Sequence, residues 1–234
     1  MPVTDFDRLN TLTSDEQKPR SMPFEQYFGE MDLTDEQIAE RIAGAERFME
    51  MMLAYFALVE FNGGIDDSNR DALTDFLVGR YRTEVLSMMF MDYQVEDHVD
   101  RFGPEITQST EENMSDEDPY WLSEDRARFI AENESNELFE HEDYIQALQQ
   151  GRTYKIWRTI MDGRQRPSHG EANGQRVPIL EPFHINGYEM QYPRDESHGA
   201  PPQEIVSCRC SMRYGGSGGD YRDILHELGY DTSE

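Results

Sequence analysis

Lysine and long apolar stretches are both scarce in this chain, and each shortage excludes a class of protein. Lysine occurs only at Lys18 and Lys155, so arginine supplies almost all of the 21 basic residues. No apolar run approaches the roughly 20 residues that a membrane-spanning helix needs, so we predict no membrane association. The first ten residues, MPVTDFDRLN, lack the basic and apolar regions of a signal peptide, and we expect synthesis in the cytoplasm.

Cysteine is also rare. The two cysteines, Cys208 and Cys210, lie in the run SCRC. A disulfide between residues i and i+2 is strained, and a cytoplasmic protein has little use for one. The pair is therefore predicted to be two free thiols or two metal ligands.

Acidic residues dominate the charge. Asp and Glu number 48 against 21 Lys and Arg, which gives a formal net charge of −27. Such a surface repels itself, and salt screens this repulsion. Because the acids are spread along the whole chain, they favour a protein of a halophilic host over an acidic disordered tail or an ordinary acidic bias. Direct DNA binding through a basic surface is not supported.

The first 120 residues predict an arm followed by helices. Residues 1–33 read as an extended arm whose aromatic cluster becomes ordered on a partner or lies on its own domain. Residues 34–120 read as a long helical hairpin and an acidic linker: Thr34 and Gln37 form a capping box at its start, and Asp67 or Ser68 caps the second helix. We expect residues 94–120 to be a loop or linker, because they are acidic and contain Gly103, Pro104 and Pro119.

The rest of the chain predicts a third helix and then strands. The helix covers about residues 121–150 and ends at Gly151. After residue 152, short β-branched and aromatic runs alternate with Asx-Gly turns, and the runs TYKIWRTI, RVPIL, YEMQY and EIVSCRCSMRY read as strands. The predicted fold class is therefore α+β, with a long N-terminal helical hairpin, a third helix and a small β-rich C-terminal unit.

Residues 215–234 read as a glycine-rich linker, GGSGG, followed by an amphipathic peptide at 221–230. Such a tethered peptide is typical of a ligand for a groove on a neighbouring protein, or it folds back on its own unit.

The cysteines suggest a zinc site. Alternate residues on a strand face the same side, so Cys208 and Cys210 would present both sulfurs together. His169 could be the third ligand, with Asp162 or His184 as the fourth. The alternative is that both cysteines pack under a loop, while His169 binds the Asp162 carboxylate.

The remaining polar residues favour structure over catalysis. Asp162, Arg164 and Arg166 are predicted to form a structural network, in which Arg166 pairs with a carboxylate such as Asp195. A cluster of Asp, His and Cys could support a metal-dependent hydrolase, but the chain contains no phosphate loop, His-Glu-x-x-His pattern or nucleophile elbow. We therefore predict that the protein is not an enzyme and has no catalytic residues.

Residues 126–214 carry a series of motifs in a specific order. The helical run RFIAENES comes first, and the positions that follow it are Trp157, Asp162, Arg166, His169, Asn173, Gly174, Val177, Pro178, Tyr192, Pro193, Asp195, Glu204, Cys208, Arg209 and Cys210. This series resembles the head-morphogenesis family named after the F protein of phage Mu, and residues 121–214 would form its domain. Two positions depart from the family pattern: Arg194 replaces a turn glycine, and Glu132-Asn133 replaces Arg-Thr.

The resemblance implies a structural minor head protein of a tailed virus. Such a protein would lie in the virion, at or near the portal vertex, and act in capsid assembly, DNA packaging or ejection. Its partners would be the portal protein, the major capsid protein or other copies of itself. An acidic, non-enzymatic binding or regulatory protein is the alternative.

Overall fold

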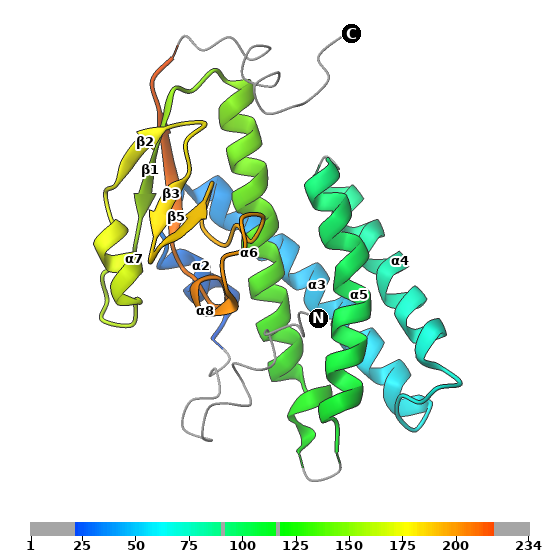
Figure 1. The fold of residues 1–234 in the computed structure, drawn as a ribbon. Coiled ribbons are helices and arrows are strands. Elements are labelled where there is room, and N and C mark those ends of the chain that lie inside the picture. The colour runs from blue at the N-terminus through cyan, green and yellow to red at the C-terminus, as the bar shows by residue number, and fades with distance from the viewer. Residues whose placement is uncertain (1–21, 90–91, 116–117, 218–234) are drawn as a thin grey trace, which may run out of the picture. The chain divides into compact units, whose positions relative to one another are not determined.

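The computed structural model describes residues 22–89, 92–115 and 118–217, and its fold is α+β as predicted. Most helices precede the small antiparallel sheets (Figure 1). The chain divides into two compact units. We call Met1–Phe24 with Ala39–Ser135 the helical unit, and Glu25–Ile38 with Asn136–Glu234 the mixed unit. Among the described residues, no helix is long and apolar enough to cross a membrane.

Helix α3, Asp35–Phe61, begins at the predicted capping box. The Gln37 backbone N–H donates to Thr34 Oγ1 at 3.3 Å, and the Thr34 N–H donates to Gln37 Oε1 at 3.0 Å. These reciprocal bonds satisfy two donors that the helix itself leaves unpaired. The helix ends before Gly63 and Gly64, which have φ of 75° and 115°. The predicted start of this helix is confirmed.

Helix α4, Arg70–Met88, starts slightly later than the predicted cap. Asn69 is its N-cap residue, so the assignment of Asp67 or Ser68 was wrong. Asp66 makes the local turn instead, because its carboxylate accepts from the Ser68 N–H at 2.8 Å. The Asp66 N–H in turn donates to Asn69 Oδ1 at 2.9 Å.

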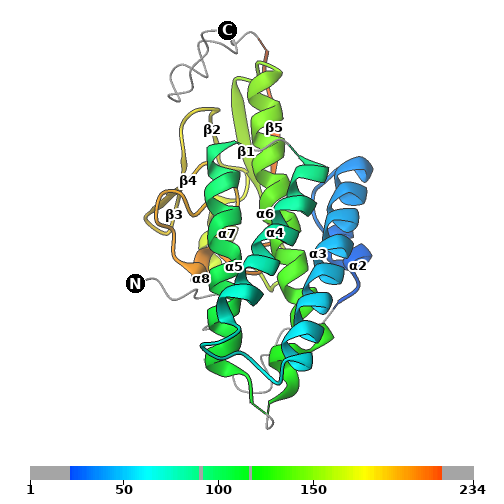
Figure 2. The ribbon, with the colours of Figure 1, turned by 90° about the vertical axis from the view of Figure 1, so that its right-hand side faces the viewer.

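Residues 94–120 are not a linker. Helix α5, Tyr93–Asn113, occupies most of this stretch, and the Asp92 carboxylate caps it by accepting from the Gln94 and Val95 N–H groups. Figure 2 shows α5 running beside α4 in the helical unit. Phe102 of α5 stacks on Tyr81 of α4 with ring centroids 4.0 Å apart.

Gly103 explains why α5 was misread as a linker. It lies inside the helix and is buried, and a Cβ built there would lie 2.3 Å from Val78 Cγ2. Glycine is needed at this point because α4 and α5 approach too closely for any side chain. Pro104 follows it inside the helix and is exposed.

Helix α6, Glu124–Gln149, follows a 3₁₀ turn, η1, at Pro119–Leu122. It ends as predicted at Gly151, whose φ is 64°, with the Arg152 N–H bonded to the Ala147 carbonyl at 3.0 Å. Near its start, Arg126 is fully buried. Its guanidinium donates to Thr110 Oγ1, Ser109 Oγ and the Trp121 carbonyl, all within the helical unit.

The described part of the N-terminal arm is helical. Helix α2 spans Phe24–Gly29, and Phe24, Tyr27 and Phe28 are all buried in their own chain. For residues 22–33 the structure therefore agrees with an arm that lies on its own chain, and the prediction of an extended arm was wrong there. Residues 1–21 lie outside the described residues.

The mixed unit is built on a three-stranded antiparallel sheet in the order β2-β1-β5. These strands are Arg176–Pro178, Tyr154–Arg158 and Ser211–Gly215. A separate hairpin pairs β3, Phe183–Ile185, with β4, Tyr188–Met190, and short helices α7, Pro167–Ala172, and α8, Pro202–Ile205, complete the unit. The core of this unit surrounds Trp157, which is fully buried.

Two predictions for the C-terminal part need correction. The run EIVSCRCSMRY is not one strand, because Glu204 and Ile205 belong to α8 and only the residues from Ser211 onward enter β5. The glycine linker begins later than expected, because Gly215 pairs with Tyr154 at the end of β5. A Cβ on Gly216 would lie 1.9 Å from Thr153 Oγ1, so this glycine is also part of the packed unit. The predicted peptide at 221–230 lies outside the described residues.

The contact at Gly103 can be tested by substitution. Gly103→Ala should lower the free energy of unfolding by about 1–3 kcal/mol, because its Cβ overlaps Val78. Gly79→Ala is the matched control. Gly79 lies on the exposed face of α4 with nothing within 4 Å of its Cβ position, so this change should raise stability by about 0.5–1 kcal/mol. Urea denaturation measures both, and a stabilised Gly103→Ala variant would contradict the close approach.

Candidate metal centre

His169, Cys208 and Cys210 converge in the mixed unit. His169 Nδ1 lies 3.3 Å from Cys210 Sγ and 3.4 Å from Cys208 Sγ, and the three ligand atoms all lie within 4.8 Å of one another. Each of the three residues is at most 2% exposed. The cysteines are not on a strand, as we had expected; they lie in the irregular segment between α8 and β5. The sequence thus predicted the three residues that meet, but not the backbone that brings them together.

Strand β1 and the residues after it hold His169 in place. Thr159 Oγ1 donates to the His169 carbonyl at 2.7 Å, and the Thr159 N–H donates to Asn173 Oδ1 at 3.0 Å. The Trp157 indole N–H donates to Thr159 Oγ1 at 3.1 Å, and its ring lies edge-on to the His169 ring. Trp157 and Asn173, both motif residues, therefore anchor the two ends of the loop that carries α7.

Glu204 on α8 fixes the orientation of the His169 ring. His169 Nε2 lies 3.1 Å from Glu204 Oε2, and Glu204 is only 6% exposed. The same carboxylate accepts from Ser168 Oγ at 3.0 Å and from Asn186 Nδ2 at 2.8 Å. An Nε2–H donated to Glu204 leaves Nδ1 directed at the two sulfurs. The sequence placed Glu204 in the motif series but gave it no role, since no fixed spacing relates it to His169.

Arg194 supports the segment that carries the cysteines. Its Nε donates to the Cys208 carbonyl at 3.1 Å, and Asn136 Nδ2 donates to the same oxygen at 3.2 Å. Arg194 is fully buried and has a φ of 74°, a left-handed backbone that favours glycine, which is the residue of the family pattern at this position. The arginine therefore adopts a conformation that side chains disfavour, and it contributes hydrogen bonds that glycine cannot make.

Arg166 does not pair with Asp195 as predicted. Its guanidinium donates instead to the Val206 carbonyl, in the same segment that Arg194 supports. Asp195 accepts from the Gln191 N–H at 2.7 Å and from the Ser197 N–H at 2.9 Å. Asp195 thus binds backbone N–H groups of its own turn, and Arg166 donates to a backbone carbonyl.

Charge is distributed unequally over the three clustered residues. Burial raises the pKa of the Cys208 thiol, but hydrogen bonding from Cys210 and the charge of His169 outweigh burial and hold that pKa well below its ordinary value. The pKa of Cys210 is held well above its ordinary value, first by its hydrogen bond to Cys208 and then by burial. Burial lowers the pKa of His169, yet the neighbouring Cys208 outweighs it and raises that pKa. The surroundings thus favour ionisation of Cys208 over Cys210 and favour the protonated form of His169.

The two residues proposed as a fourth ligand lie elsewhere. Asp162 accepts from Arg209 at 2.8 Å and from Arg164 at 2.7 Å. Burial raises the pKa of Asp162, but these two arginines outweigh it and bring the pKa to about 2. The His184 side chain on β3 is 65% exposed and faces Glu189. The structure brings neither residue to the cluster.

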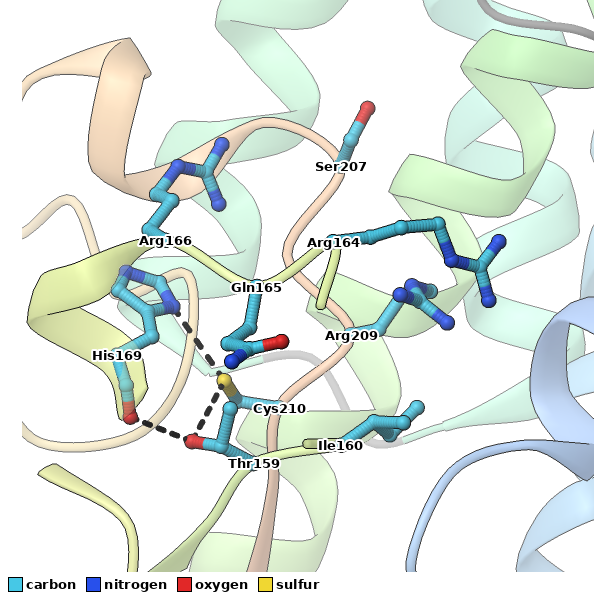
Figure 3. Close-up of a pocket in the computed structure, with 9 residues that line it drawn as sticks. All are labelled: Thr159, Ile160, Arg164, Gln165, Arg166, His169, Ser207, Arg209 and Cys210. Carbon is cyan, nitrogen blue, oxygen red and sulfur yellow. Dashed lines mark hydrogen bonds between the residues drawn. The ribbon is translucent and has the colours of Figure 1, made fainter. Parts of the chain in front are cut away.

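A pocket of about 240 Å³ opens beside the cluster. His169 and Cys210 are part of its lining, together with Thr159 and Arg166, as Figure 3 shows. Cys208 is not among the lining residues. A thiolate, an imidazolium and a carboxylate in this order also occur in cysteine hydrolases. Here Cys208, whose ionisation the surroundings favour, does not line the pocket, and Cys210, which does, has its pKa raised, so the arrangement favours ligation over nucleophilic attack.

A comparison with known protein families finds a match, and it covers the part of the chain that contains the cluster. Residues 102–213 match the family described as Phage Mu protein F like protein. The match runs from α5 to β5 and contains the cluster, Glu204 and Arg194. No curated protein and no solved structure matches the chain. The family match supports the resemblance drawn from the motifs.

The role of Arg194 predicts an order of stability. Arg194→Ala should lose the charge-assisted hydrogen bond to the Cys208 carbonyl, a loss of about 1.5–3 kcal/mol in the free energy of unfolding. Arg194→Gly should lose the same bond but recover about 1 kcal/mol, because glycine relieves the left-handed backbone. Denaturation should therefore rank wild type above Arg194→Gly and Arg194→Gly above Arg194→Ala. An alanine variant as stable as wild type would show that the guanidinium contributes nothing, because alanine keeps the left-handed backbone and loses only the hydrogen bond.

Proposed function

We propose that this protein is a minor head protein of a tailed virus, located at or near the portal vertex, where it acts in capsid assembly, DNA packaging or ejection. The observation that carries the proposal is the family match over residues 102–213, which takes in residues 136–213 of the mixed unit, all of α6 and the C-terminal half of α5. Its partners would be the portal protein, the major capsid protein or further copies of itself.

The geometry of the cluster supports a structural role over an enzymatic one. All three clustered side chains are at least 98% buried, and hydrogen bonds from two neighbouring elements fix the histidine. A group built to attack a substrate must reach it, and Cys208 does not line the pocket. We therefore propose that the cluster stabilises the mixed unit and that the protein is not an enzyme.

The location can be tested on purified virions. Quantitative mass spectrometry should find this chain in a small, fixed number of copies per particle, far below the major capsid protein. Cryo-electron microscopy of the portal vertex should place it there. The alternative, an acidic binding or regulatory protein, predicts its presence in infected cells and its absence from washed particles, and that result would overturn the proposal.

The distribution of charge supports a host that lives at high salt. Several arginines pair with acids, among them Arg70 with Glu111 and Arg82 with Asp100, yet 48 acids face only 21 bases. The single lysine of the described residues, Lys155, is fully buried. Its Nζ donates to the Gln191 carbonyl at 2.8 Å and lies 4.8 Å from the centre of the Tyr144 ring. The described surface is thus acidic with arginine as its only fixed cation, a composition that molar salt tolerates.

This interpretation predicts a salt requirement. The isolated protein should lose structure on dialysis from molar salt to low ionic strength, because its acids then repel one another without screening. Circular dichroism melts across a salt series would show the melting temperature rising with ionic strength. NaCl and KCl at equal ionic strength should act alike, since screening depends on charge concentration. A melting temperature that stays constant over the series would contradict the assignment to a halophilic host.

A further inference from the structure

We propose that His169, Cys208 and Cys210 bind a zinc ion, with a water molecule in the fourth position on the pocket side. This inference does not depend on the proposed role in the virion. It rests on the distances, donor chemistry and surroundings of the cluster described above.

The spacing of the donor atoms fits zinc. With Zn–S bonds of about 2.3 Å and Zn–N bonds of about 2.05 Å, tetrahedral geometry separates a sulfur from a nitrogen ligand by about 3.5 Å. The two observed separations between His169 Nδ1 and the sulfurs are 3.3 and 3.4 Å. An ion can therefore enter with shifts of a few tenths of an ångström. Two thiolates and an imidazole are ligands that zinc prefers over magnesium or calcium.

The surroundings of the histidine are those of a metal ligand. Zinc-binding histidines usually donate their other ring N–H to a carboxylate or carbonyl, which fixes the ring and makes it a stronger ligand. Glu204 accepts from Nε2 in this way, and Ser168 and Asn186 hold Glu204 in turn. A histidine that only filled space would not need an oriented carboxylate at 6% exposure.

The fourth position faces the pocket. No further His, Cys, Asp or Glu joins the three ligands in the part of the chain that the structure describes. His169 and Cys210 are part of the lining of the pocket, so a water ligand would lie on that side of the cluster. Asp162 and the His184 side chain are engaged elsewhere, and water is the simplest ligand left.

Such a site would hold together a unit that has little regular structure. It would join α7 to the irregular segment before β5, across about 40 residues of chain, and its binding free energy would add to folding. The other chemistry open to the two cysteines is a disulfide, which would leave no metal bound.

Metal analysis of the full chain is the primary test. Protein purified under reducing conditions in molar salt and loaded with zinc should hold one zinc per chain by mass spectrometry. Cys208→Ser, Cys210→Ser and His169→Ala should each lose it, whereas Asp162→Asn and His184→Ala are controls that should keep it. Wild type without zinc after loading, or a triple variant that retains it, would overturn the proposal.

Two measurements remain informative if the ligand variants fail to fold. Wild type loaded with Co²⁺ should show thiolate-to-cobalt charge-transfer bands and the strong visible bands of a tetrahedral ion, and a spectrum of six-coordinate cobalt would rule the site out. Glu204→Gln should weaken zinc affinity about 10–100-fold by competition with a chelator, as expected for loss of an orienting carboxylate. An unchanged affinity would show that Glu204 does not orient a ligand. If the protein is found in virions but contains no zinc, the metal site is refuted and the proposed role in the virion is not.

Discussion

The mixed unit depends on holding the irregular segment Val206–Cys210 in place. This stretch has no strand partner, and Ser207 within it has a φ of 56°. Its buried carbonyl groups need donors, because an unpaired buried carbonyl costs free energy. Arg194 and Asn136 supply two at Cys208, and Arg166 supplies one at Val206. Side chains from three separate parts of the unit thus do the work that a ladder of strand hydrogen bonds does elsewhere.

Local sequence signals predicted the elements whose causes are local. The capping box at Thr34, the stop at Gly151 and the β-branched run of β1 each depend on residues a few positions apart, and each was found where expected. Helix α5 was missed because Gly103 and Pro104 normally end helices. Gly103 leaves room for Val78 of α4, and no sequence pattern within α5 can reveal that contact.

The candidate site shows the same division. Residue chemistry alone was enough to group His169 with Cys208 and Cys210, because few other side chains in the chain suit a soft metal. Residue chemistry could not decide which residue, if any, would be the fourth ligand. Asp162 has a suitable carboxylate, but Arg209, which lies between the two cysteines in sequence, binds it. The role of Glu204 required knowing that α8 passes beside α7.

The burial of Lys155 has a practical consequence for mapping the neighbours of this protein. Reagents that join or label proteins through primary amines find no lysine on the described surface, because the one lysine there is enclosed by Tyr144, Phe183 and Gln191. A neighbour in direct contact would then give no amine crosslink to this surface. Proximity has to be measured through carboxylates, which this chain presents in abundance.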